Sequence, residues 1–71
     1  GFAVHRNLQG EGIGQVVLRT LVDAAFQRGG DEVMVHAPCS IERFYLREGF
    51  TPWGEQFLEA GIAYVEMHKP L

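Results

Sequence analysis

The polar positions between residues 12 and about 28 recur every four residues, which predicts a helix. Four polar side chains fall on a single stripe of that helix: Gln15, Arg19, Asp23 and Gln27. Apolar or small residues occupy most of the remaining surface. An apolar surface this wide is typical of a helix that packs against a sheet and exposes only a narrow polar face. Gly29 and Gly30 end the pattern, since glycine adopts the left-handed cap conformation easily.

Short apolar segments on both sides of this helix have the composition of strands. Residues 1–5 read as the end of a strand, and residues 32–37 as a buried strand that Pro38 ends. Two further strands are expected at residues 50–53 and 64–68. In the last of these, Tyr64, Glu66 and His68 alternate with Val65 and Met67.

A second, shorter helix is expected at residues 40–47, with Ser40 as a candidate cap. Ile41, Phe44 and Tyr45 share one face of it by their spacing. Residues 55–62 are expected to form a loop. The order is therefore β-α-β-α-β-β, a mixed α/β sheet that starts with a parallel βαβ unit and ends with two antiparallel strands.

Length and charge narrow the possible functions. A chain of 71 residues forms at most one small domain, and the start at Gly1 without an initiator Met suggests a piece of a longer protein. The net charge of −3 argues against general binding to nucleic acid or to a membrane surface. Cys39 is the only cysteine, which fits a reducing compartment, and we expect a cytoplasmic protein.

The segment before the long helix has the features of a phosphate-binding loop. Gly10, Gly12 and Gly14 alternate between the first strand and the helix, so unhindered backbone amides gather at a helix N-terminus. The dinucleotide-binding motif would need glycine at position 15 or 17, and the Walker motif needs Gly-Lys-Ser/Thr. Gln15 and Val17 exclude the first, and no such tripeptide occurs in the sequence.

The spacing instead resembles motif A of the GNAT superfamily of N-acyltransferases, Gln/Arg-x-x-Gly-x-Gly/Ala. It is carried here by Gln9-Gly10-Glu11-Gly12-Ile13-Gly14. A second signature of that family, Phe-Tyr-x-x-x-Gly-Phe, matches residues 44–50, and residues 54–62 with Met67 resemble the ElaA-like subgroup. The resemblance implies that residues 1–71 are the C-terminal half of one GNAT-like domain whose N-terminal half is absent from the chain.

In that family the loop binds the pyrophosphate of acyl-coenzyme A, and the preceding strand pairs with the pantetheine arm. The resemblance therefore implies coenzyme contacts at Phe2, Val4, Gln9, Gly10, Glu11, Gly12, Ile13, Gly14 and Gln15. Tyr45 matches the tyrosine that often protonates the departing thiolate. Pro38 stands where many members have an asparagine that contacts the coenzyme, so no role is carried over to it.

Other reactive side chains have simpler interpretations. Cys39 with His36 could be a nucleophile and its base, but a bystander cysteine is the favoured interpretation. No paired ligand spacing links Cys39 with His5, His36 and His68, so we predict no metal. Glu55, Glu59 and Glu66 are candidates to deprotonate an amine, although solvated charges are the favoured interpretation.

The predicted function is transfer of an acetyl or other acyl group from acyl-coenzyme A directly to a primary amine. One alternative is a coenzyme-binding regulatory or structural module without turnover, and another is a module of a larger multidomain protein. The expected partners are acyl-coenzyme A and an amine acceptor, with no nucleic acid and no membrane. A missing N-terminal half or a homo-oligomer partner would complete the sheet.

Overall fold

The computed structural model describes residues 1–7 and 13–71, and its elements follow the predicted order. Two strands and a helix come first: β1 (Ala3–Asn7), α1 (Gln15–Gln27) and β2 (Glu32–Pro38). A 3₁₀ turn, Cys39–Ile41, leads into α2 (Glu42–Arg47). A long hairpin of β3 (Thr51–Glu59) and β4 (Ile62–Pro70) follows.

The strands form one four-stranded mixed sheet in the order β1-β2-β4-β3. β1 and β2 run parallel, from the pair Ala3 and Glu32 to the pair Asn7 and His36. β4 pairs antiparallel with both β2 and β3. The predicted parallel unit and the predicted antiparallel ending are both confirmed.

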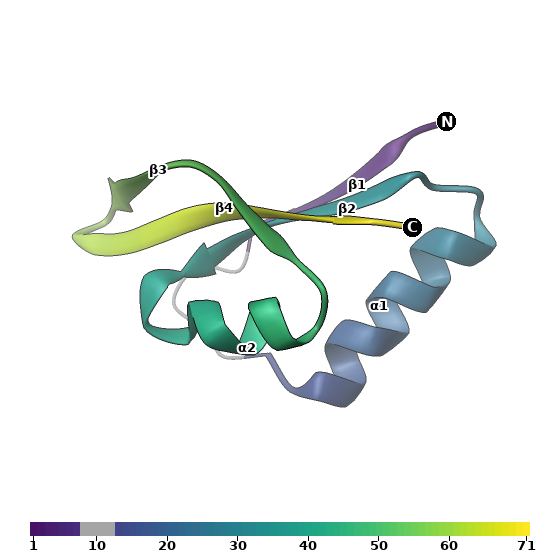
Figure 1. Ribbon diagram of the computed structural model, residues 1–71, viewed down its shortest axis with the longest axis horizontal. Coiled ribbons are helices and arrows are strands. Elements are labelled where there is room, and N and C mark those ends of the chain that lie inside the picture. The colour runs from purple at the N-terminus through teal and green to yellow at the C-terminus, as the bar shows by residue number, and fades with distance from the viewer. Residues whose placement is uncertain (8–12) are drawn as a thin grey trace.

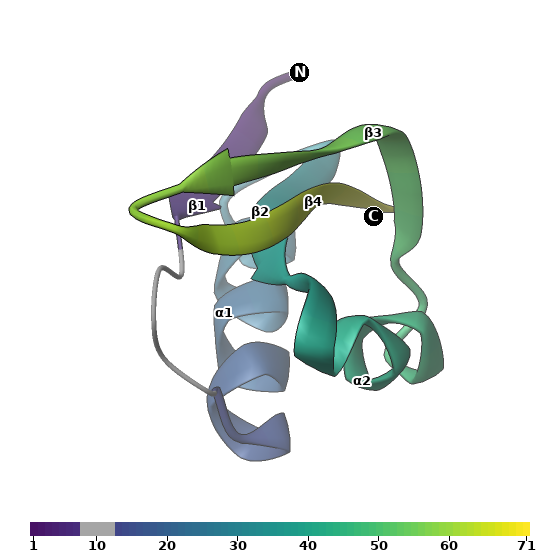
Figure 2. The ribbon, with the colours of Figure 1, turned by 90° about the vertical axis from the view of Figure 1, so that its left-hand side faces the viewer.

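Both helices lie against the same face of the sheet, and Figures 1 and 2 show no other described element on the opposite face. Side chains on alternate positions of β2 and β4 account for this arrangement. Val33, Val35 and Ala37 of β2 are buried, and they belong to one core with Val65 and Met67 of β4. The core continues into the helices through Leu18, Ala25 and Tyr45.

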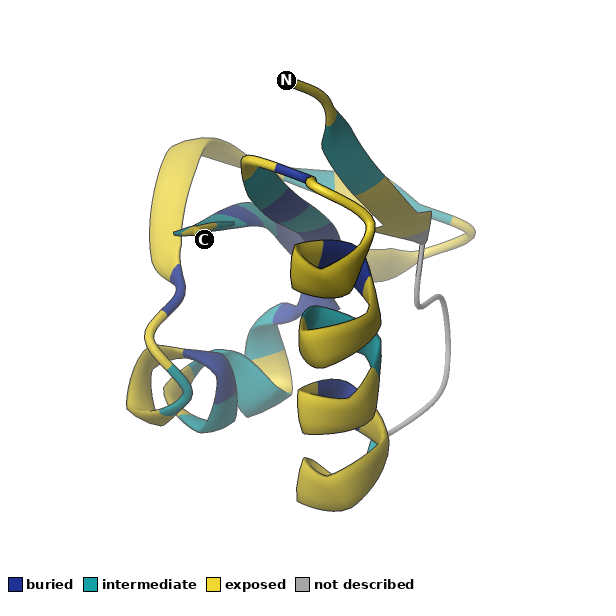
Figure 3. Ribbon diagram, turned by 90° about the vertical axis from the view of Figure 1, so that its right-hand side faces the viewer, coloured by how far each residue is buried: buried dark blue, intermediate teal, exposed yellow. Residues whose placement is uncertain are grey.

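Much of α1 remains exposed despite its apolar composition. Leu18 and Ala25 are its buried residues, whereas Val16 and Val17 are 77% and 58% exposed. Figure 3 shows the exposed surface running along the whole helix. The wide apolar surface that the sequence predicts is therefore present, but the described sheet covers only part of it.

The loop predicted at residues 55–62 is wrong, because β3 extends to Glu59 and β4 begins at Ile62. The turn between them consists of Ala60 and Gly61, which both have positive φ (51° and 77°), as a tight hairpin turn requires. The register shifts between Trp53 and Phe57, and Gly54 in that segment also has positive φ (79°). β3 lies at the sheet edge and is exposed over most of its length, so no buried alternation marks it in the sequence.

The start of the second helix also differs from the prediction. Residue 40 lies inside the 3₁₀ turn, and the cap position of α2 is Ile41, without a side-chain hydrogen bond. Pro38 is the last residue of β2 and pairs with Tyr64 of β4. No described residue of β1 pairs with Pro38, which fits the position of proline at the end of a strand.

Candidate functional site

The candidate site lies at the end of the described β1–β2 ladder. The last described β1–β2 pair joins Asn7 to His36, while β2 continues through Ala37 and Pro38. The predicted phosphate loop follows Asn7 in the sequence. Gln9, Gly10, Glu11 and Gly12 lie outside the described residues, so their assignment stays a prediction.

The N-terminus of α1 lies next in the described chain. Gly14 is the cap residue, with φ −73° and ψ 154°, and its carbonyl oxygen accepts a hydrogen bond from Leu18 N at 2.9 Å. Among the described residues no side chain caps this end, and the first turn contains no acidic residue. The first amides of a helix have no partner within the helix and carry partial positive charge, which suits an anion. Ile13, just before the cap, is half-buried against the core.

Side chains from α1 and the end of α2 hold this region together through Glu48. Gln15 Nε2 donates to Glu48 Oε2 at 2.9 Å, and Arg19 Nε donates to Glu48 Oε1 at 2.9 Å. The hydrogen bond from Arg19, followed by that from Gln15, lowers the pKa of the Glu48 carboxyl. Lys69 Nζ of β4 donates to the Glu48 carbonyl oxygen at 2.9 Å. Gln15, a predicted coenzyme contact, is therefore already engaged with α2.

Tyr45 is buried in the core between two other aromatic rings. It is 0% exposed, and its ring makes edge-to-face contacts with Phe44 and Phe50 at centroid distances of 5.2 and 5.6 Å. Burial raises the pKa of Tyr45 to about 12, so the phenol keeps its proton. No group within residues 1–7 and 13–71 hydrogen-bonds to its buried hydroxyl.

Phe2 and Val4, also predicted to contact the coenzyme, lie at the other end of β1. Phe2 O accepts a hydrogen bond from Asp31 N at 2.6 Å, and Val4 is paired with Val33. Phe2 is half exposed. Their assignment stays a prediction. The structure puts them at the start of the β1–β2 ladder, away from its last described pair, Asn7 and His36.

A chain of histidines and carboxylates crosses the open face of the sheet, and the sequence did not single it out. His68 Nδ1 lies 3.0 Å from Glu32 Oε1, and His68 Nε2 lies 2.6 Å from Glu66 Oε2. Glu66 Oε1 in turn lies 3.6 Å from His36 Nε2. Burial alone lowers the pKa of His68, but the hydrogen bonds with Glu66 and Glu32 outweigh it, and the net shift is upward.

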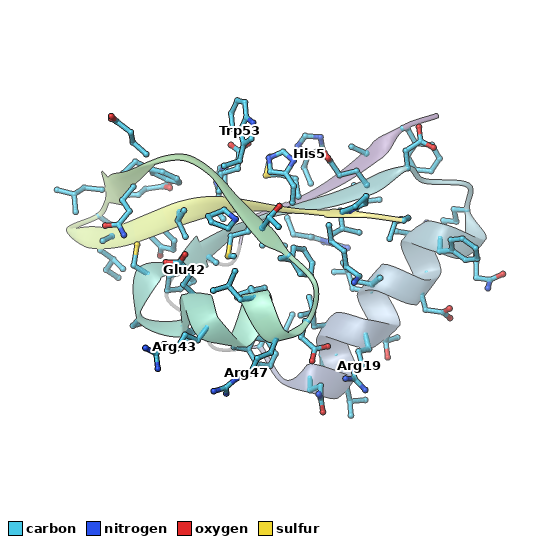
Figure 4. The ribbon with its side chains drawn as sticks, viewed as in Figure 1. His5, Arg19, Glu42, Arg43, Arg47 and Trp53 are labelled. Atoms are coloured by element: carbon cyan, nitrogen blue, oxygen red, sulfur yellow. The ribbon has the colours of Figure 1, made fainter. Side chains whose placement is uncertain are left out.

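Aromatic rings of β3 border this chain. The ring of Phe57 packs edge-on against that of His36, with a centroid distance of 5.0 Å. The ring centroids of Trp53 and His68 are 5.6 Å apart. Figure 4 shows Trp53 and His5 on this face, and Arg19, Arg43 and Arg47 on the helix side. The grouping depends on the β2–β4 register, in which His36 pairs with Glu66 and Met34 with His68. The signal in the sequence was the alternation of Glu66 and His68, but that pattern does not reveal which residues of β2 lie beside them.

The other candidates from the sequence are not part of this chain of contacts. Cys39 is a half-buried free thiol that packs against the core, and Glu55 is exposed. Within the described part of the chain, no group of three or more His, Cys, Asp or Glu side chains is arranged to hold a metal ion. None of the described helices has the length and apolar character needed to cross a bilayer.

Comparison with known proteins identifies the fold. All of residues 1–71 match the acetyltransferase (GNAT) domain. A predicted N-acetyltransferase from Lactobacillus plantarum is 32% identical, with a TM-score of 0.77 over 89% of this chain and 43% of that one. An acyl-CoA N-acyltransferase from Pseudomonas aeruginosa is 27% identical, with a TM-score of 0.75 over 86% and 42%.

Escherichia coli ElaA is likewise 27% identical, with a TM-score of 0.72 over 87% of this chain and 42% of its own. The chain thus spans less than half the length of these solved structures, as expected for half of such a domain. The match over its full length and the shared fold lead to one conclusion. This chain belongs to the GNAT acetyltransferase domain family.

Proposed function

We propose that the protein transfers an acetyl or other acyl group from acyl-coenzyme A directly to a primary amine. The reaction needs a neutral amine, a polarised thioester carbonyl and a proton for the departing thiolate. Membership of the GNAT family supports the acyltransferase activity. In this proposal, residues of this chain give the departing thiolate its proton and bind the coenzyme.

The observation that carries the proposal is the buried hydroxyl group of Tyr45. Buried hydroxyl groups in native proteins nearly always have a hydrogen-bond partner, and exceptions need an explanation. That of Tyr45 has none among the described residues, and its raised pKa keeps it a proton donor at neutral pH. In our proposal the donor completes its hydrogen bond with the thioester sulfur and gives that sulfur its proton.

The coenzyme would bind across the end of the β1–β2 ladder. The loop from Gln9 to Gly14 and the uncapped start of α1 would bind the pyrophosphate through backbone amides. The pantetheine arm would run along β2 beyond His36, where no described residue of β1 pairs with β2. The thioester would then lie close to α2, which carries Tyr45.

The remainder of the acceptor site would come from another part of a complete GNAT domain, or from a second copy of the chain. This chain covers 42–43% of the solved acyltransferases described above. β1 is the edge strand of the described sheet, and α1 exposes apolar side chains beside it. Both features favour a neighbour on this side.

The test is release of free thiol from acetyl-coenzyme A by the complete protein, measured against a panel of primary amines. We expect amine-dependent thiol release together with a product amide detected by mass spectrometry. Tight coenzyme binding with no thiol release for any amine would instead indicate a non-catalytic coenzyme-binding module. Absence of both would contradict the proposal.

A further inference from the structure

We propose that His36 is the base that deprotonates the acceptor amine, and that Glu66 is the positioning residue that holds its ring. This assignment rests on the acyltransferase function proposed above and adds to it the missing proton acceptor. It places the acid and the base on opposite faces of the same sheet. It starts from the position of His36 in the β1–β2 ladder.

His36 occupies the last described pair of that ladder, next to the place that we propose for the thioester. Its neighbour in β2, Ala37, is buried in the same core as Tyr45 on the helix side. Alternate residues of a strand point to opposite faces, so His36 faces the open side. An amine arriving from that side would meet the carbonyl carbon opposite the sulfur that Tyr45 protonates.

Of the two histidines in this chain of contacts, only His36 has a ring nitrogen without a partner among the described residues. Both ring nitrogens of His68 and both carboxylate oxygens of Glu66 already lie within 3.6 Å of a partner in the chain. His36 Nε2 faces Glu66, whereas its Nδ1 is buried and has no hydrogen-bond partner among the described residues. A carboxylate beside Nε2 favours the proton on that nitrogen, which leaves the lone pair on Nδ1.

The charges around His36 support the same role. Glu66 stabilises the imidazolium that forms when Nδ1 takes a proton, and His68 fixes Glu66 from its other oxygen. β3 contributes the uncharged ring of Phe57. By strand pairing and alternation, the titratable groups on this face among the described residues include Glu32, Glu59, Tyr64, Glu66, His68 and His5.

The proton balance is complete without another reactant. Nδ1 of His36 takes one proton from the ammonium form of the acceptor, and the neutral nitrogen attacks the thioester carbonyl. The C–N bond forms and the C–S bond breaks, while Tyr45 gives its proton to the departing sulfur. The second proton of the attacking nitrogen restores Tyr45, and His36 releases its proton to water. One amide, one thiol and one proton result.

His36→Gln in the complete protein tests the assignment, because it keeps a donor near Glu66 and removes the basic nitrogen. We expect kcat/KM for a basic alkylamine to fall by roughly 10²- to 10³-fold at neutral pH, with unchanged affinity for acyl-coenzyme A. An acceptor of low basicity, already neutral at that pH, should recover most of the loss. His5→Gln replaces another histidine of this face and should keep wild-type activity.

Glu66→Gln provides a second, independent test. It should move the acidic limb of the kcat/KM profile for the amine, a change that a purely structural role would not produce. Wild-type protein without amine-dependent thiol release would contradict the acyltransferase proposal itself. An active wild type whose His36→Gln and Glu66→Gln variants keep its rate and pH profile would overturn the role of His36. An equal loss of kcat/KM in His36→Gln with amines of high and low basicity would also overturn it.

Discussion

At the scale of single residues, the hydroxyl group of Tyr45 combines two features that are costly in a folded protein. It is buried, and it has no hydrogen-bond partner among the described residues. The ring itself is well packed between Phe44 and Phe50. Packing therefore explains an aromatic side chain at this position but not its hydroxyl group, for which our proposal supplies the thioester sulfur as a partner.

Tyr45→Phe separates these two roles. Because the variant removes an unpartnered hydroxyl and keeps the ring, the free energy of unfolding should stay the same or rise. Turnover should fall about 10²- to 10⁴-fold with little change in coenzyme affinity, because the proton donor is lost. Thermal melts and steady-state kinetics measure the two effects.

Tyr64→Phe, which deletes the hydroxyl of the other buried tyrosine, is the matched control and should keep most of the turnover. Full turnover in Tyr45→Phe would make Tyr45 a core residue only.

The raised pKa of Tyr45 predicts a loss of stability at alkaline pH. Burial disfavours the tyrosinate and raises the pKa from 10.0 to about 12, so the folded state holds a proton that the unfolded state releases first. The stabilising contribution is complete below pH 10 and is lost as the pH rises through about 12. The unfolding midpoint of the wild type should therefore fall, relative to Tyr45→Phe, across this window. If the unfolding midpoints of the two proteins changed in parallel with pH, the raised pKa of Tyr45 would be contradicted.

The sequence predicts a catalytic role for Tyr45, which stays a prediction, but it does not predict the histidine–carboxylate chain, and the reason is physical. Residues 44–50 form one local motif, whose spacing within a helix and its cap is visible in the sequence. His36 and Glu66 meet only through the antiparallel register of β2 and β4, thirty positions apart. A shift of one residue would have put them on opposite faces. No local pattern specifies that register.

At the scale of elements, the N-terminus of α1 has no side-chain cap among the described residues. Gly14 has an ordinary extended conformation, and a side chain at this position would meet nothing within 4 Å. Neither backbone geometry nor space in the fold therefore requires glycine there. A ligand that approaches the first turn closely would require it.

Gly14→Asp should consequently change stability and binding in opposite directions. Aspartate is a better helix cap than glycine by a few tenths of a kcal/mol, so the melting temperature should rise slightly. The same carboxylate would occupy the first amides and repel a pyrophosphate, so affinity for acyl-coenzyme A should fall. Calorimetric titration measures the second effect. Gly14→Asn caps the helix without the charge and should lose less affinity; unchanged affinity in both variants would remove this end of α1 from the site.

Gly12→Asp tests the predicted loop from within. It adds a carboxylate and a Cβ where the family resemblance puts the pyrophosphate next to the backbone. Binding of acyl-coenzyme A should be abolished in the same titration. Unchanged affinity would mean that the glycine-rich segment is not the phosphate site.

The central strands were predicted better from the sequence than β3 was. β2 and β4 have apolar alternations that their burial in the structure explains, whereas α1 was predicted from its polar stripe and buries only part of its apolar surface. β3 is exposed over most of its length and contains Pro52 and Gly54, both typical of loops. Its strand conformation comes from pairing with β4 across the Ala60–Gly61 turn, which is a tertiary effect.

At the scale of the whole molecule, the described residues present an unpaired sheet edge and an uncovered helix side next to each other. β1 is the first strand of the sheet order, and Phe2 beside it is 48% exposed. On α1, Val16 and Val17 are exposed as well. Each such side chain left in water forfeits about 1.5–3 kcal/mol of burial, against a typical domain stability of about 5–15 kcal/mol.

The 71 residues alone should therefore not form a stable monomer at low concentration. We expect dimers or aggregates, or a need for the rest of a GNAT domain to be added. Sedimentation across a dilution series with far-ultraviolet dichroism checks this. Replacing Val16 and Val17 with lysine should reduce association if the exposed side of α1 drives it. A cooperative melt from a compact monomer at micromolar concentration would contradict the expectation, but not the family assignment.

The position of β4 in the sheet also has a consequence for synthesis on the ribosome. β4 is the last strand along the sequence, yet it lies between β2 and β3. While the chain emerges at about 5–20 residues per second, β1 is the one described strand that β2 can pair with, and β3 has no neighbour among the described strands. Both acquire their shared partner when residues 62–70 appear. The nascent sheet therefore stays open until its central strand arrives, and a translational pause before residue 62 would expose the interior valines of β2 for the duration of the pause.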